Sequence, residues 1–224
     1  MPEPPSVCAS AKTDAWSGNP GMAMTSNQRN WTVFLTTMGV ALAVSFAVLA
    51  VAGKNEENIR SLLRMTARLA FLLLLVVLVA RPLRQLVKTP GTLTLLKNRR
   101  SLGVSFAGMH TAHLALIMTL AYRVPAFELN WITRLPGMAT YMMIYLMLIT
   151  SFDRPARAIG KKRWKVLHKV GLYWLFIAFA QRELPRSLDN VDPVIWLLTA
   201  LITAALVIRI TAFFVTRRST PQPQ

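Results

Sequence analysis

The sequence predicts an all-α membrane protein, a six-transmembrane-helix bundle with both the N and C termini cytoplasmic. Three observations carry this prediction. The chain of 224 residues is 54% hydrophobic, with a mean hydropathy of +0.41, which is too apolar for an ordinary soluble domain. Its apolar residues gather in runs of roughly 17–25, the length that a helix needs to cross a bilayer. Its positive charges gather between alternate runs.

The N-terminal part begins with a polar tail, residues 1–30, which is rich in Pro, Ser, Gly and Asn and is expected to be disordered. The first span is predicted at 31–51, which carries no charge. The following link, GKNEENIRSLLRMTAR, is amphipathic and fits a segment at the membrane surface. The second span is predicted at 65–86, where Arg68 and Arg81 flank a short uncharged centre and can snorkel toward water.

The remaining spans are separated by polar links. A basic loop with a turn at Pro90–Gly91 is expected after the second span. The third span is predicted at 102–122 and the fourth at 135–152. After a second basic loop, the fifth span is predicted at 164–181 and the sixth at 193–215. A single membrane domain therefore occupies 31–216, and 217–224 form a C-terminal tail.

The net charge of +17 on a soluble protein would suggest nucleic acid as a partner. Here most of the 26 Lys and Arg residues lie in the tails and in the loops after the second and fourth spans. Basic residues collect on the cytoplasmic side of membrane proteins. The charge therefore predicts topology, cytoplasmic termini and no nucleic-acid partner, and the third and fifth spans run in the same direction, outward from the cytoplasm.

All three histidines of the chain, His110, His113 and His168, lie inside predicted spans. Ionisable residues are rare there unless they pair, bind a ligand or line a pathway. His110 and His113 share roughly one face of their helix because they are three residues apart. Histidines that face each other on parallel helices can bind haem iron from both sides of the macrocycle. Interhelical hydrogen bonding is the plainer alternative for each histidine.

Other residue types narrow the chemistry. Cys8 is the only cysteine, so covalent haem attachment and iron–sulfur or zinc clusters of cysteines are excluded. The predicted spans contain no carboxylate, which disfavours a proton relay. Arg100 and Arg163 would lie at the cytoplasmic mouth of the histidine site, where they could balance haem propionates or a phosphate-bearing cofactor. Topology alone also accounts for these arginines.

Four segments resemble the MsrQ (YedZ) family of the ferric-reductase-like transmembrane domain superfamily. They are MTARLAFLLLLVVLVARPLRQL, NRRSLGVSFAGMHTAHL, NWITRLPG with LMLITSF, and IGKKRWKVLHKVGLYW. The resemblance covers about residues 60–182, in the family's order. It implies that the first family histidine is His113 and the second is His168. The third falls on Gln181, which is a departure from the family pattern, and His110 is an additional histidine.

The resemblance implies one b-type haem, bound between His168 and either His113 or His110, with a second haem in doubt because of Gln181. It implies a membrane subunit of an oxidoreductase system. No G-x-G-x-x-G motif is present, so electrons would come from quinol or from a separate cytoplasmic flavin reductase that brings FMN. They would leave to a periplasmic reductase or to ferric iron. A bacterial inner-membrane location follows from the same resemblance.

A different class of function remains open. A non-redox membrane protein, structural or transporting, could keep this fold after losing haem competence. Gln181 favours that alternative, whereas the three histidines favour haem binding. The expected function is therefore haem-mediated electron transfer across the membrane, and haem content is the property that separates the two classes.

Overall fold

The computed structural model describes residues 25–53, 55–123, 131–189 and 192–218, and these contain seven α-helices and no strand. The expected N-terminal tail up to residue 24, the link 124–130 and the last residues, 219–224, lie outside the described residues. The helices are α1 (Ser26–Ala52), α2 (Glu56–Leu86), α3 (Pro90–Arg123), α4 (Trp131–Ile149), α5 (Asp153–Ile159), α6 (Lys161–Asp189) and α7 (Pro193–Arg218).

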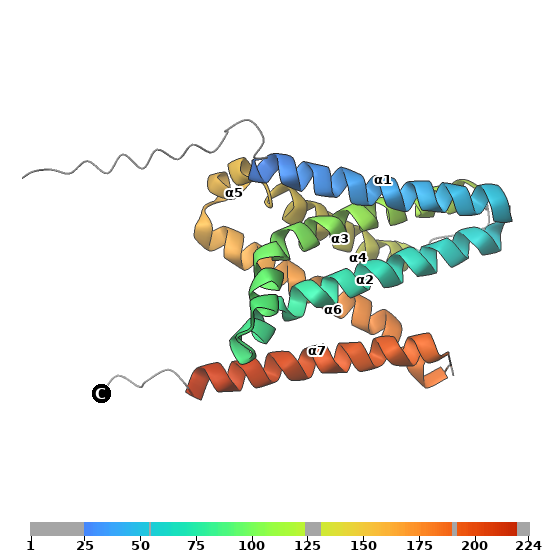
Figure 1. The fold of residues 1–224 in the computed structure, drawn as a ribbon. Helices are drawn as coiled ribbons and strands as arrows, with labels where there is room; N and C mark the ends of the chain where they lie inside the picture. The colour runs from blue at the N-terminus through green and yellow to red at the C-terminus, as the bar shows by residue number, and fades with distance from the viewer. Residues whose placement is uncertain (1–24, 54, 124–130, 190–191, 219–224) are drawn as a thin grey trace, which may run out of the picture.

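Six long helices pass back and forth along one bundle, and the short α5 turns the chain between α4 and α6 (Figure 1). α2 packs against α3 and α7, α1 packs against α3, and α6 packs against α4 and α7. The first turn of α1 lies at the same end of the bundle as the last turn of α7. The links from α2 to α3 and from α4 to α6 lie at that end too, on the left in Figure 1.

Four helices, α1, α2, α3 and α7, are long and apolar enough to cross a membrane. α4 and α5 together could form a fifth crossing, bent by 103° at the break between them. α6 is not among these candidates, because it begins with basic residues and continues past the apolar run into a polar end. These lengths and compositions indicate a multi-pass membrane protein.

The helices extend beyond the predicted spans because polar residues cap them. α1 begins at Ser26 rather than Trp31, since the Thr25 hydroxyl accepts a hydrogen bond from the Gln28 amide and the Gln28 side chain accepts one from the Thr25 amide. This reciprocal capping box is a strong helix start. The amphipathic link after the first span forms the first turns of α2, where Asn55 accepts a hydrogen bond from the Asn58 amide at 2.9 Å.

The turn expected at Pro90–Gly91 is wrong, because Pro90 is the first residue of α3. Proline suits the first helical position, where its missing N–H would have no partner. The side chain of Thr89 accepts a hydrogen bond from the Thr92 amide at 3.4 Å and caps the helix start. Only residues 87–89 separate α2 from α3, so the predicted basic loop is mostly helical.

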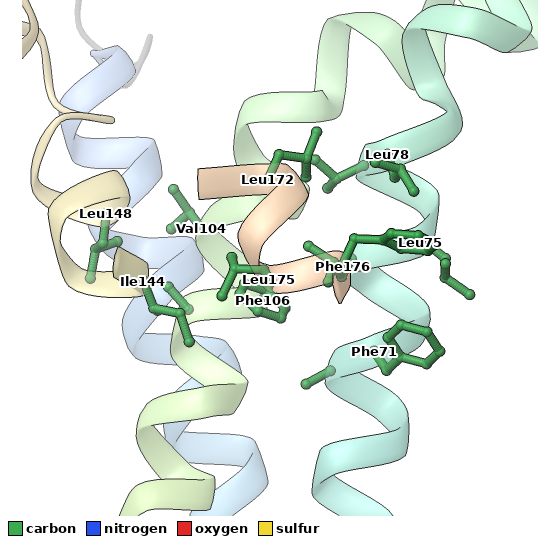
Figure 2. Packing of buried hydrophobic residues seen from close by; sticks show 14 of the residues in the cluster. Phe71, Leu75, Leu78, Val104, Phe106, Ile144, Leu148, Leu172, Leu175 and Phe176 are labelled. Carbon is green, nitrogen blue, oxygen red and sulfur yellow. The ribbon is translucent and has the colours of Figure 1, made fainter. Parts of the chain in front are cut away.

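The core forms where α2, α3, α4 and α6 meet (Figure 2). The buried side chains of α6, Leu172, Leu175 and Phe176, lie between those of α2 and those of α4. One face of α6 is therefore packed in the core along this stretch, whereas Tyr173, Trp174 and Ile177 on its other face are exposed. α1 and α7 instead expose most of their large apolar side chains, as helices that face lipid would.

Two glycines allow close helix contacts. A Cβ added at Gly108 of α3 would lie 2.8 Å from the carbonyl oxygen of Phe34, on the backbone of α1. A Cβ added at Gly171 of α6 would meet the sulfur atoms of Met143 and Met147 on α4. Small residues at such crossings let two helix backbones approach each other, which is a common device in membrane bundles.

The break after α4 is held by polar contacts from distant parts of the chain. The carbonyl of Ser151 accepts hydrogen bonds from the side-chain amide of Asn30 at 3.1 Å and from Arg100 Nε at 2.6 Å. Arg100 also forms an ion pair with Asp153 at 2.9 Å. Asn27 accepts a hydrogen bond from the Asp153 amide at 3.1 Å. These contacts tie the starts of α1 and α5 and the adjoining part of α3 to the end of α4.

We expect Gly108→Ala to lower the apparent Tm of the detergent-purified protein. Alanine favours the helix by about 1 kcal/mol over glycine, but its Cβ meets the backbone of α1, and overpacking costs about 1–3 kcal/mol. Thermal unfolding followed by tryptophan fluorescence measures the change.

The matched control is Gly103→Ala, on the same helix, where an added Cβ meets nothing within 4 Å. This variant should keep or raise the apparent Tm. Equal shifts in the two variants would contradict the close contact between α1 and α3.

Candidate functional site

His113 on α3 is oriented by Thr66 on α2. Its Nδ1 lies 2.8 Å from the Thr66 hydroxyl oxygen. That hydroxyl also lies 2.9 Å from the carbonyl of Leu62 and 3.2 Å from that of Leu63. Donation to either carbonyl makes the hydroxyl oxygen the acceptor and places the imidazole proton on Nδ1. In that tautomer Nε2 of His113 keeps a lone pair and is the atom that could bind a metal.

His110 lies one turn earlier on α3 and is 6% exposed. Its ring packs among those of Phe106, Phe179, His113 and Tyr141, with centroid distances of 4.7, 5.5, 5.6 and 5.8 Å. Neither Nδ1 of His110 nor the buried hydroxyl of Tyr141 has a hydrogen-bond partner among the described residues. Unsatisfied buried polar atoms are rare in folded proteins. Nδ1 of His110 and the Tyr141 hydroxyl could therefore each form a further hydrogen bond within this cluster of rings.

His168 on α6 lies in a different setting. Its Nε2 is 3.0 Å from the hydroxyl of Thr150, which donates to the carbonyl of Leu146 at 2.7 Å. When Thr150 donates to that carbonyl, Nε2 of His168 carries the proton and Nδ1 keeps the lone pair. The indole of Trp164 packs on the imidazole at 4.3 Å and donates to the Thr150 carbonyl at 2.8 Å. His168 thus joins the start of α6 to the end of α4.

The structure brings His110 and His113 together but does not bring either of them to His168. Phe179 contacts His110 and follows His168 by 11 positions on the same helix, which is a separation of about 16 Å at the helical rise. His168 instead lies near Arg100, because its partner Thr150 adjoins Ser151, to which Arg100 donates. The histidines therefore lie at two different levels along the bundle axis, with His110 and His113 at one level and His168 at the other.

The other predicted site residues are placed as follows. Arg100 is committed to the Ser151 carbonyl and to Asp153. Arg163 is exposed on α6 and lines an open surface hollow together with Lys162 and Val166. Gln181, the position of the third family histidine, is exposed and lies within two positions of Phe179, so it falls near the level of His110.

Two residues that the sequence analysis did not single out also matter. Glu183 was expected in a link, but α6 continues to Asp189, and Glu183 is 8% exposed. Arg209 lies within the predicted sixth span and donates to the Leu78 carbonyl of α2 at 2.8 Å. A lone arginine in an apolar run was the signal that could have identified it.

Thr66→Val should lower the apparent Tm more than Thr203→Val. Loss of the Thr66 hydroxyl leaves the Nδ1–H of His113 without an acceptor, and an unsatisfied buried donor costs about 1–3 kcal/mol. Thr203 is an exposed threonine whose hydroxyl bonds only to the Thr199 carbonyl of its own helix at 3.0 Å. Nitrogen-15 NMR of labelled histidine should also show His113 protonated on Nδ1 in the unsubstituted protein. Protonation on Nε2 would contradict the assigned hydrogen-bond direction.

Comparison with protein-family models, curated proteins and solved structures found no match to this chain. Within the described residues, no three His, Cys, Asp or Glu side chains gather as a potential metal site. Haem needs only one or two protein ligands. The chemistry of the site therefore rests on Nε2 of His113, Nδ1 of His168 and the aromatic rings packed around His110.

Proposed function

We propose that this chain is an electron-transfer protein of the bacterial inner membrane, with one haem b held through His113. The observation that carries the proposal is the 2.8 Å contact between Nδ1 of this imidazole and the Thr66 hydroxyl, which leaves Nε2 to bind a metal in the tautomer protonated on Nδ1. Metal-binding histidines in proteins are usually oriented in this way by a partner on the other ring nitrogen. The resemblance to the MsrQ family points to the same residue.

The donor set fits a single axial histidine and not a pair. Two imidazoles on one iron, with metal–nitrogen bonds of about 2 Å, must place their ring nitrogens roughly 4 Å apart on opposite sides of the macrocycle. His168 lies at another level of the bundle, and His110 is on the same helix face as His113. Neither lies opposite His113, so a single histidine ligand is proposed. Haem with one proximal histidine is well established in proteins.

The membrane topology is proposed as six spans with cytoplasmic termini. The back-and-forth course of the six long helices supports it (Figure 1), as does the packing of one face of α6 in the core. The described parts of the two basic loops lie at one end of the bundle, and this end is assigned to the cytoplasm by its positive charge. His168 then lies near the cytoplasmic end, and His113 lies toward the periplasm.

Bound haem would supply a one-electron carrier inside a low-dielectric bundle. The chain itself contributes orientation of His113 by Thr66 and exclusion of water by the rings around His110. Because Arg100 is already paired with Asp153, Arg163 is the predicted basic residue left to contact a partner. The donor would be quinol or a separate cytoplasmic flavin reductase carrying FMN, and the acceptor would be a periplasmic reductase or ferric iron.

One observation favours the alternative, a non-redox membrane protein that keeps this fold. The bonded nitrogen atoms of His113 and His168 both pair with threonines of neighbouring helices. Interhelical hydrogen bonds of this kind stabilise membrane bundles without any cofactor. Haem content distinguishes the two functions.

The test uses the full chain, expressed in bacteria with ample haem and purified in detergent. We expect a b-type reduced-minus-oxidised spectrum and about one haem per chain, as one axial histidine allows. His113→Ala should lose most of the haem, whereas His168→Ala should retain it because His168 lies at the other level. Added carbon monoxide should bind, since a single axial ligand leaves one iron position open.

The other outcomes decide between the alternatives. Absence of haem in the unsubstituted protein would exclude electron transfer and support the non-redox function. Loss of haem in both alanine variants would show that the histidines act as a pair. Loss only in His168→Ala would move the site to the cytoplasmic level.

A further inference from the structure

Pro82 lies inside α2 and removes one backbone hydrogen bond of that helix. A proline at position i has no N–H to donate to the carbonyl of residue i−4, which here is Leu78. In a membrane bundle that carbonyl needs another donor. Arg209 of α7 supplies it, with Nη1 2.8 Å from the Leu78 oxygen. Arg99 of α3 donates through Nε to the neighbouring carbonyl of Val77 at 3.0 Å.

These contacts concentrate positive charge on one side of the bundle. Arg81 directly precedes Pro82 and lies one helical turn after Val77 and Leu78, whose carbonyls Arg99 and Arg209 contact. The ion pairs of the described residues join Arg60 to Glu56, Arg68 to Asp192 and Arg100 to Asp153. None of them involves Arg81, Arg99 or Arg209, so the cluster of these three arginines has no carboxylate counter-ion in the described part of the chain.

The arginine cluster keeps hydrogen-bond donors free while two of its members are fixed. Arg99 uses only Nε, so both of its terminal NH2 groups remain available. Arg209 is held in place by Leu78 and by the hydroxyl of Tyr173 at 2.5 Å, and its guanidinium lies over the Tyr173 ring. Such a fixed set of guanidinium groups matches the oxygens of a phosphate.

The side chains around the arginine cluster indicate which kind of molecule would supply the phosphate group. Around Arg209, α7 exposes a broad apolar surface formed by Leu206, Val207, Ile210, Phe213 and Phe214. A phospholipid is complementary to this combination, because its phosphodiester can reach the arginines while its acyl chains cover the apolar side chains. Basic sites between transmembrane helices on the cytoplasmic side are known to bind anionic headgroups.

We propose that Arg81, Arg99 and Arg209 bind the phosphodiester headgroup of an anionic phospholipid at the end of α2. The site depends on the membrane placement of the chain and not on haem. The lipid would neutralise the cluster and join α2, α3 and α7, whose arginines converge there.

The experiment uses native mass spectrometry of the full chain in detergent, with added phosphatidylglycerol or phosphatidylcholine of identical acyl chains. We expect phosphatidylglycerol to be retained preferentially and to raise the apparent Tm, and inorganic phosphate alone to do neither. Arg81→Gln should weaken phosphatidylglycerol binding about tenfold or more, the effect of losing one charged hydrogen bond. The side chain of Arg81 is exposed and has no hydrogen bond to the rest of the described protein, so this variant should fold normally.

Arg99→Gln is the second variant and should also weaken binding. Arg217→Gln is the control, because Arg217 carries the same charge on α7 but lies over the ring of Phe213, with 4.5 Å to the centroid, and should leave binding unchanged. Equal retention of the two lipids, or equal weakening in Arg81→Gln and Arg217→Gln, would overturn the proposal. A comparable Tm rise with inorganic phosphate would overturn the assignment to lipid.

Discussion

Backbone carbonyls that lose their helical partners constrain much of this structure. Pro82 frees the carbonyl of Leu78, and the bend after α4 exposes that of Ser151. An unpaired carbonyl is costly in a bilayer, where no water can replace the lost donor. The chain satisfies each with side chains from distant helices, namely Arg209 for Leu78 and Arg100 with Asn30 for Ser151. The same contacts hold the end of α4 against α1 and α3, and α7 against α2.

The helices were largely predictable, because five of the six predicted spans lie within long helices, and the fourth, 135–152, overruns the end of α4 at Ile149 by three residues. The residues at which the helices begin and end were less predictable. Composition identifies where a chain is apolar enough to be buried, but capping by Thr25 and Asn55 and the placement of Pro90 decide where helices begin. The short α5 was missed because its sequence is polar and basic, as a loop would be. Which face of α6 is buried depends on its neighbours and could not be read from its own residues.

The candidate site was predictable in its residues and not in its arrangement. Spacing alone placed His110 and His113 on one face, and the structure agrees. The level of His168 depends on how α6 is aligned against α3, which side-chain packing sets through contacts such as that between Phe179 and His110. The threonines that orient His113 and His168 come from α2 and α4. A sequence gives no direct sign of such partners, because many intramembrane threonines bond only to their own helix.

The contact between Asn30 and the Ser151 carbonyl has a consequence for biogenesis. The two residues are 121 positions apart, so at about 5–20 residues per second roughly 6–24 s of translation separate their synthesis. During that interval α1 can pack on α2 and α3, but its buried asparagine has no carbonyl to bind. The contact that ties the start of α1 to the end of α4 can therefore form only after α4 has been made. Its insertion and its docking are then separate events, and a chaperone or insertase would have time to act between them.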